Sequence, residues 1–398
     1  KGGTGEKNMV EYICRYFDQY QIPYILQEAL PGRFNVLAHL KGTGKGALCF
    51  EAHTDTVTVD EMEIEPFKPV IQNGRLYGRG SVDDKGSVAA MMYAMRLLKE
   101  HKIETYSDIY FAAAAEEEFS YKGVLRLLED GIPFDAAVVG EGTSVHVCRA
   151  CKGNVRFKIV SRGLAGHSSR PWEGRNAIVA MANVICELEK KLFPLYEQKK
   201  HPLLGPPTFN ISLIHGGKLI NIVPDYCEIQ IDRRVLPGET YQSVRQEVLG
   251  CLESLLSSHP EYEVEIQEPF VTDFAMEVEE DSPIVRTAIA ACDAIMGEHT
   301  IEGGYFSCDA SKFTRIGIPA IVMGPGSILQ AHTNDEYIEI SDLAKAAEVF
   351  TYMDNDLRQE LIKTFSSSEI KSLFEELYAD DAADFLSDMP ANFVTQLL

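Results

Sequence analysis

Apolar and polar positions follow two different periods over the first part of the chain. Residues 7–20 and 85–99 carry apolar side chains at helical spacing, and each stretch predicts a helix. Short apolar runs at 46–50, 108–115 and 136–140 are typical of buried strands instead. Because strands and helices alternate along the chain, the pattern predicts an α/β fold with a mostly parallel sheet.

The pattern changes near residue 152. Residues 154–160 and 226–232 alternate polar and apolar side chains, which is typical of half-exposed antiparallel strands. Helical spacing at 177–191 and 241–256 contributes to a strand-helix-strand-strand-helix-strand order. This order predicts a separate α+β domain of ferredoxin-like form, inserted into the first domain.

The α/β pattern resumes after the insertion, with helical spacing at 284–295 and an apolar run just before Gly324. From about residue 354 short amphipathic helices follow, and the apolar end of the chain suggests a separate module cut short. We therefore expect a catalytic domain in two halves, an inserted domain and a short helical tail. The expected limits are 1–152 and 269–353 for the halves, 153–268 for the insertion and 354–398 for the tail.

Polar residues at the ends of apolar runs are the first sign of chemistry. His53 and Asp55 follow the run at 46–50 and point to the same side, so that one can bind a metal ion while the other orients it. More acids and a second histidine lie downstream, most of them just past an apolar run: Asp83, the triplet at 116–118, Glu141 and His332. Ligands gather outside the carboxyl ends of strands in open α/β sheets. So many carboxylates converge only where cations neutralise them, and two divalent metal ions are the simplest answer.

Composition narrows the classes of partner. The formal net charge of −23 argues against nucleic acid and anionic membranes. An apolar run of about 18 residues, as a membrane span needs, does not occur, so we expect no membrane insertion. The nine scattered cysteines are typical of reduced thiols and a cytoplasmic location. Cys148 and Cys151 have redox-motif spacing but are interpreted as structural.

Several motifs occur in a specific order between residues 7 and 350. They are His53-Thr-Asp55, Gly78 to Gly86, Glu117-Glu118, Glu141-Gly-Thr, Gly166-His167-Ser-Ser, Asn221 to Pro224, Asp232 to Gly238 and Gly324 to His332. In this order and spacing they resemble the dinuclear metallohydrolases typified by acetylornithine deacetylase, succinyl-diaminopimelate desuccinylase, aminoacylase and carboxypeptidase G. The last motif is most similar to the acetylornithine deacetylase form.

The resemblance implies a set of metal ligands. His53 and Glu141 hold one metal ion, and Glu118 and His332 hold the other. Asp83 bridges the two ions, and the peptide that follows it is expected to be cis. We expect zinc, with cobalt or manganese as alternatives, because imidazole and carboxylate ligands suit these metals. The two ions, about 3.5–4 Å apart in such sites, would activate a bridging water.

The resemblance also implies catalytic roles. Glu117 is expected to be the general base, and Asp55 to orient His53. His167 is expected to stabilise the oxyanion, and in dimeric members of the family the neighbouring subunit supplies it. Glu116 stands where the family usually has Asp, and we interpret it as a solvated side chain.

Substrate contacts are expected from the inserted domain, which is interpreted as a lid and dimerisation domain. Arg234, helped by Asn221, is the candidate for the free carboxylate of the substrate, because a guanidinium group binds carboxylates bidentately. Arg233 is the alternative, since strand alternation allows only one of the two arginines to face the site. We expect a homodimer that forms through this domain.

These residues predict a metal-dependent hydrolase that cleaves the amide bond of an N-acyl amino acid, with N-acetylornithine as the leading candidate. A dipeptidase or carboxypeptidase, or a succinyl-diaminopimelate desuccinylase, is the alternative within the class. A non-catalytic binding protein on the same fold is the alternative from another class. Residues 368–390 of the tail resemble a helical repeat in the N-domain of MgtE-type magnesium transporters, and we infer no transport from that resemblance.

Overall fold

A computed structural model describes residues 5–354 of the chain. The described residues divide into two compact units. The second unit consists of Ala150–Glu277 and Gly303–Ser307, and the remaining described residues form the first unit. The predicted domain limits stay a prediction, and the predicted tail lies outside the described residues from residue 355 on.

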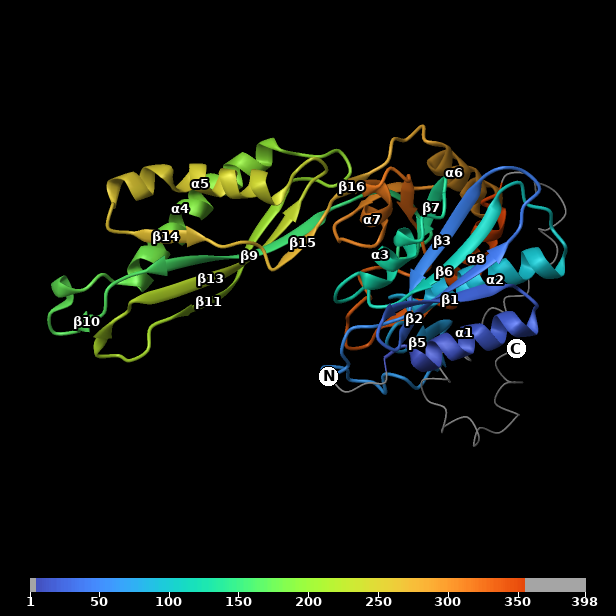
Figure 1. The fold of residues 1–398 in the computed structure, drawn as a ribbon, viewed down its shortest axis with the longest axis horizontal. Helices are drawn as coiled ribbons and strands as arrows, with labels where there is room; N and C mark the ends of the chain where they lie inside the picture. Colours follow the sequence, from blue (N-terminus) through green and yellow to red (C-terminus); the bar gives the residue numbers. More distant parts are fainter. Residues whose placement is uncertain (1–4, 355–398) are drawn as a thin grey trace. The chain divides into compact units, whose positions relative to one another are not determined.

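The first unit is built around a sheet whose central strands are parallel (Figure 1). In spatial order these strands are β6 (Asp108–Ala114), β3 (Ala47–His53), β7 (Ala136–Val139) and β18 (Ala320–Val322). Other strands extend the sheet on both sides: β1 (Tyr24–Leu30) and β2 (Arg33–Leu40) beyond β6, and β8 (Val147–Cys151) beyond β18. The chain passes into the second unit within β8, and β8 also pairs with β17 (Ile301–Gly304) and with β16 (Met276–Glu277), which belongs to the second unit. The α/β class with a mostly parallel central sheet is therefore confirmed.

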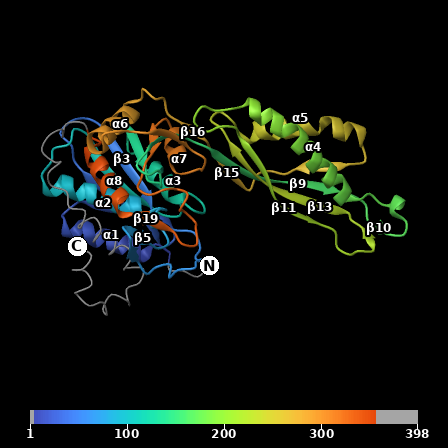
Figure 2. The ribbon, with the colours of Figure 1, turned by 180° about the vertical axis from the view of Figure 1, so that it is seen from behind.

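Helices cover both faces of this sheet. They are α1 (Lys7–Gln19), α2 (Lys85–Glu100), α3 (Lys122–Glu129), α6 (Pro283–Met296), α7 (Ala310–Arg315) and α8 (Ile340–Tyr352). Phe17 of α1 packs on Phe111 of β6, with ring centroids 5.9 Å apart. The neighbouring Tyr110 points to the opposite face, where it contacts Phe134, which in turn packs on Phe313 of α7. Figure 2 shows α2 and α8 next to each other, and these two helices are in contact.

A small antiparallel sheet lies in the same unit. It consists of β4 (Val70–Gln72), β5 (Arg75–Tyr77) and β19 (Tyr337–Glu339), with β5 in the middle. Tyr77 pairs with Tyr337, and their rings lie 5.3 Å apart. The pairing brings the segment that leads to Asp83 beside the segment that follows His332, although the two are far apart in the sequence.

The second unit contains a separate antiparallel sheet covered by two helices. Its chain order is β9 (Gly153–Arg162), α4 (Ala177–Gln198), β11 (Thr208–Gly216), β13 (Tyr226–Val235), α5 (Tyr241–Ser258), β14 (Glu263–Ile266) and β15 (Val271–Asp273). The strands lie side by side as β11-β13-β9-β14, and β15 also pairs with β9. Two short strands, β10 (Gly166–His167) and β12 (Ile222–Val223), pair with each other, and the 3-10 helix η1 (Pro171–Glu173) follows β10. The ferredoxin-like order is therefore confirmed.

Helix α4 is longer than its sequence pattern predicts, because it continues beyond residue 191 to Gln198 and contains Pro194. Leu188, Leu192 and Tyr196 follow each other at helical spacing and are all buried in the core of this unit. Their burial extends the apolar face of the helix past the proline. No helix among the described residues combines the length and the hydropathy that a membrane span requires.

Candidate metal centre

The predicted ligands of the first unit lie at the carboxyl ends of its parallel strands. His53 is the last residue of β3, Glu118 follows β6, and Glu141 follows β7. His332 lies in the loop after β18, and Asp83 lies just before α2. The peptide between Asp83 and Asp84 is cis, as the resemblance implied.

Asp83 lies between the two histidines. Its Oδ1 is 2.8 Å from Nε2 of His53, and its Oδ2 is 2.9 Å from Nε2 of His332. The same nitrogen of His332 is 3.1 Å from Oε1 of Glu118. Ligand atoms of His53, Asp83 and Glu118 all lie within 4.8 Å of one another. A carboxylate that offers one oxygen to each of two imidazoles has the arrangement that a ligand shared by two metal ions requires.

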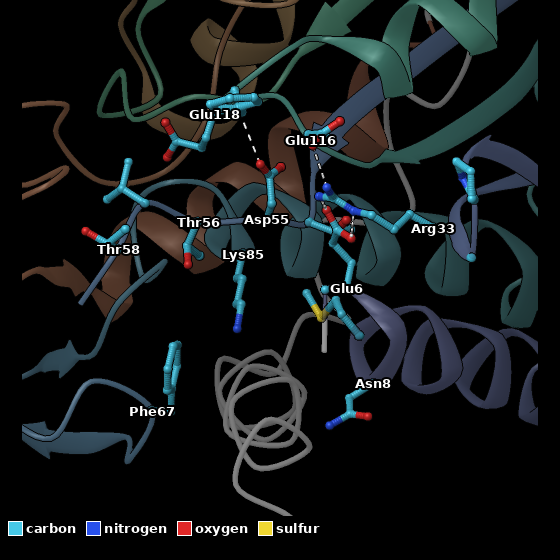
Figure 3. A pocket seen from close by; sticks show the side chains of 17 residues that line it. Glu6, Asn8, Arg33, Asp55, Thr56, Thr58, Phe67, Lys85, Glu116 and Glu118 are labelled. Atoms are coloured by element: carbon cyan, nitrogen blue, oxygen red, sulfur yellow. Dashed lines mark hydrogen bonds and ion pairs between the residues drawn. The ribbon is translucent and has the colours of Figure 1, made fainter. Parts of the chain in front are cut away.

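Asp55 connects the end of β3 to the acidic triplet. Its two carboxylate oxygens accept hydrogen bonds from the backbone N–H groups of Glu117 (3.0 Å) and Glu118 (3.2 Å). Its Oδ1 also lies 3.4 Å from Nδ1 of His53. The backbone carbonyl oxygen of Asp55 lies closer to the same nitrogen, at 3.1 Å, so that this one residue orients the imidazole and the backbone of two carboxylates. Figure 3 shows Asp55 directly beside Glu118.

The electrostatics of this cluster suit positive ions. Burial raises the pKa of Glu117 well above its ordinary range. Burial and then the charge of Asp83 do the same to the pKa of Glu141. Hydrogen bonds to Asp83 and Glu118 raise the pKa of His332 to about 10. Buried carboxylates with raised pKa values are stabilised by a positive charge nearby. Together with two imidazole nitrogens they form a donor set that fits divalent metal ions.

The interpretation of Glu116 as a solvated side chain was wrong. Glu116 is buried, its φ is 62°, and its Oε1 lies 2.5 Å from Nη1 of Arg33. Arg33 also donates to both carboxylate oxygens of Glu6 (Figure 3). Ser120 donates to the other oxygen of Glu116. Glu6, Arg33 and Glu116 line a cavity of about 920 Å³ whose wall also includes Asp55 and Glu118. Sequence reasoning missed Arg33, because its partners are far away in the chain.

The remaining predicted residues belong to the second unit. His167 is exposed, and its Nδ1 lies 2.7 Å from Oγ of Ser169. Asn221 is exposed as well. Arg234 is partly exposed and donates through Nε to Asp232 at 2.9 Å.

Arg233, the alternative to Arg234, has a different environment. Its side chain is fully buried, and Nη2 donates to both carboxylate oxygens of Glu239 at 3.0 Å. Its guanidinium carbon also lies 4.6 Å from the ring centroid of Tyr196. Arg233 is therefore part of the core of the second unit, whereas Arg234 is accessible.

Sequence reasoning also missed Glu336. This carboxylate is completely buried and contacts the loop that carries Asp83. The acid lies only a few residues after His332, in a polar segment without an apolar run before it. A buried acid in such a segment gives no periodic signal, so only the fold could reveal it.

Comparisons with known proteins find two family models that match parts of the chain. Residues 49–353 match the model of peptidase family M20/M25/M40, and residues 329–398 match that of the MgtE intracellular N domain. The chain is 31% identical over 363 residues to an acetylornithine deacetylase of Buchnera aphidicola subsp. Acyrthosiphon pisum (strain Tuc7), which covers 88% of this chain and 91% of the relative. It is 32% identical over 327 residues to the acetylornithine deacetylase of Edwardsiella ictaluri (strain 93-146). That match covers 81% of this chain and 82% of the relative.

Solved structures show the same fold. A tripeptidase from Staphylococcus aureus superimposes with a TM-score of 0.72 at 20% identity, over 90% of this chain and 100% of that one. An M20 family metallo-carboxypeptidase from Sulfolobus solfataricus reaches a TM-score of 0.68 at 19% identity, over 87% and 92% of the two chains.

Proposed function

This chain belongs to peptidase family M20/M25/M40, and on that premise we propose that it hydrolyses the amide bond of N-acylated amino acids, with N-acetylornithine as the leading substrate. Family and relatives establish a metal-dependent hydrolase of amide bonds that acts on small amino-acid or peptide substrates. The observation that carries the proposal is the position of Asp83 between two imidazoles, in a chain that is similar to acetylornithine deacetylases over most of its length.

Two divalent ions, most simply zinc, fit this donor set. We assign His53 and Glu141 to one ion, Glu118 and His332 to the other, and Asp83 to both. When bound, such ions lower the pKa of water and polarise the carbonyl of the substrate.

Glu117 is the proposed general base. It is buried beside the ligands, and the hydrogen bond from its N–H to Asp55 fixes its backbone. Its carboxylate takes a proton from the attacking water while the oxygen adds to the acyl carbon. The same proton then passes to the nitrogen of the substrate as the C–N bond breaks, which yields a carboxylic acid and a free amine.

The second unit supplies the proposed substrate contacts. Arg234 pairs with the free carboxylate of the substrate, with help from Asn221, because its guanidinium group is accessible and that of Arg233 is not. His167 donates to the developing oxyanion. We assign His167 to the neighbouring subunit of a homodimer, as in dimeric members of the family.

Exposed apolar side chains support the homodimer. Strand β11 forms one edge of its sheet, and Leu213 and Ile214 on it are 49% and 54% exposed. Ile178 and Val179, at the start of α4, are exposed as well. An open strand edge flanked by exposed apolar residues is a surface on which a second copy of the chain can pair.

Two further assignments complete the proposal. We place the enzyme in the cytoplasm, because all nine of its cysteines are free thiols. We assign the residues beyond 354 to a separate module. Support for a second module at this end is the match of residues 329–398 to the MgtE intracellular N domain, which overlaps the last residues of the M20/M25/M40 match.

A substrate panel tests the proposed function. Metal-stripped protein, refilled with zinc, cobalt or manganese, is assayed on N-acetylornithine, N-succinyl-diaminopimelate and a set of dipeptides. Metal-restored turnover of N-acetylornithine is expected. Turnover of dipeptides alone would make the protein a dipeptidase instead. No turnover of any substrate, with two ions bound, would favour a binding role.

A further inference from the structure

Glu336 occupies an unusual position for a carboxylate. Its side chain is completely buried in the first unit, and it lies in the same polar segment as His332. Burying a carboxylate is costly unless hydrogen bonds and an opposite charge compensate for the lost hydration. The partners of Glu336 therefore show what the fold uses it for.

All the partners that this side chain has in the described part of the chain come from one loop. Oε2 accepts hydrogen bonds from Nη1 of Arg79 (2.8 Å) and from the N–H of Gly80 (3.0 Å). Oε1 accepts hydrogen bonds from the N–H groups of Val82 (2.8 Å) and Asp83 (3.2 Å). The loop that carries the proposed bridging ligand thus surrounds the carboxylate of Glu336, and both carboxylate oxygens accept hydrogen bonds from it.

The backbone of Glu336 holds the same loop. Its carbonyl oxygen accepts a hydrogen bond from the N–H of Gly78 at 3.0 Å. Directly after it, β19 pairs with β5 in the antiparallel register Tyr337 with Tyr77 and Ile338 with Leu76. Glu336 therefore lies at the end of the paired strands β5 and β19. From this end one loop leads to Asp83 and the other leads to His332.

We propose that Glu336 is a positioning residue that fixes Asp83 relative to His332 and thereby sets the affinity of the metal centre. This inference rests on the proposed function, because it assumes that these two residues bind metal. Asp83 contacts both histidines, so a shift of its backbone changes the geometry on both sides of the centre. Metal and catalytic constellations tolerate displacements of only about 0.5 Å.

Glu336→Gln is the sharpest perturbation. The amide keeps the size of the side chain but has one oxygen, whereas the loop needs two acceptors. Either orientation of the amide places an NH₂ group against backbone N–H donors. Residues that orient metal ligands from outside the coordination sphere contribute about 10- to 100-fold to metal affinity, so we expect a loss of that size.

Controls separate positioning from general loosening. Glu339→Gln removes an acid of the neighbouring strand that pairs with Arg75 among the described residues, and 39% of its side chain is exposed. It should leave metal affinity unchanged. Glu336→Asp keeps the negative charge but withdraws it from the loop by one methylene, so it should also weaken metal binding, and it serves if the glutamine variant does not fold.

The experiment is a cobalt titration of the metal-stripped full chain, followed by calorimetry and by the visible absorption of bound Co²⁺, which reports ligand geometry. Circular dichroism checks that each variant is folded. We expect weaker binding and a changed spectrum for the Glu336 variants, with wild-type behaviour for Glu339→Gln. Wild-type affinity and spectrum in a folded Glu336 variant would overturn the inference, as would an equal loss in the Glu339 variant. A wild-type protein that binds no cobalt would instead refute the metal centre itself.

Discussion

The neighbouring residues Arg233 and Arg234 on β13 provide a test of which side chain of the second unit binds the substrate. We predict that Arg233→Met destabilises the protein, whereas Arg234→Met weakens substrate binding and leaves stability almost unchanged. The two substitutions remove the same charge from adjacent positions on one strand. Any difference between them therefore comes from the face of the strand on which each side chain lies.

The structure allows both magnitudes to be worked out. Removal of one partner from a buried ion pair costs about 3–5 kcal/mol. Lys199 also contacts Glu239 and Glu247, the two acids that face Arg233, so we expect about 3 kcal/mol for Arg233→Met. Within the described part of the chain, Arg234 forms an ion pair with Asp232, and Arg156 also pairs with that acid. The loss of stability for Arg234→Met should therefore stay below about 1 kcal/mol.

For catalysis we expect the larger effect from Arg234→Met, whereas Arg233→Met has the larger effect on stability. A hydrogen bond to a charged group contributes about 1.5–3 kcal/mol, and 1.4 kcal/mol corresponds to a factor of ten. Arg234→Met should raise KM for N-acetylornithine about 10- to 100-fold. Urea unfolding followed by circular dichroism gives the stabilities, and steady-state kinetics give KM and kcat. A stable Arg233→Met variant with a raised KM, beside an unstable Arg234→Met variant, would refute the assignment of the two faces.

Further substitutions test the other parts of the account. Glu117→Ala should lower kcat at least about 100-fold, because general acid–base catalysis contributes a rate factor of about 10²–10⁴. Elemental analysis of this variant should still find bound metal, and normal turnover would show that another residue is the base. Ile214→Glu on the edge strand β11 should convert a dimer into monomers in light scattering, since it places a charge on the open strand edge, and an unchanged mass would exclude this surface as the interface. Removal of residues 355–398 should leave kcat/KM on N-acetylornithine unchanged, and a collapse of activity would mean that these residues belong to the catalytic body.

Local patterns were sufficient for much of the fold and for the positions of the proposed ligands. His53 and Glu141 each follow a short apolar run, and runs of that kind form the parallel strands whose ends meet at one edge. The inserted unit was predictable because alternation with period 2 in β9 and β13 contrasts with the fully buried β3.

Contacts between distant segments were not predictable in this way. The partnership of Arg33 with Glu116 and that of Glu336 with Arg79 join residues that are far apart in the chain. Nothing in the local spacing marks such acids as buried, and Glu116 was misread as solvated for that reason. The end of α4 was missed because Pro194 is a helix breaker by propensity, whereas the burial of Leu192 and Tyr196 outweighs that cost here.

The most direct test of the central claim is a zinc titration of the metal-stripped protein, in which bound zinc and hydrolysis of N-acetylornithine are measured at each step. We predict that two equivalents of zinc bind and that activity reaches its maximum at the second equivalent, because the proposed centre shares Asp83 between two ions. Full hydrolysis in the absence of metal, or an Asp83→Ala variant with wild-type affinity and stoichiometry, would contradict it.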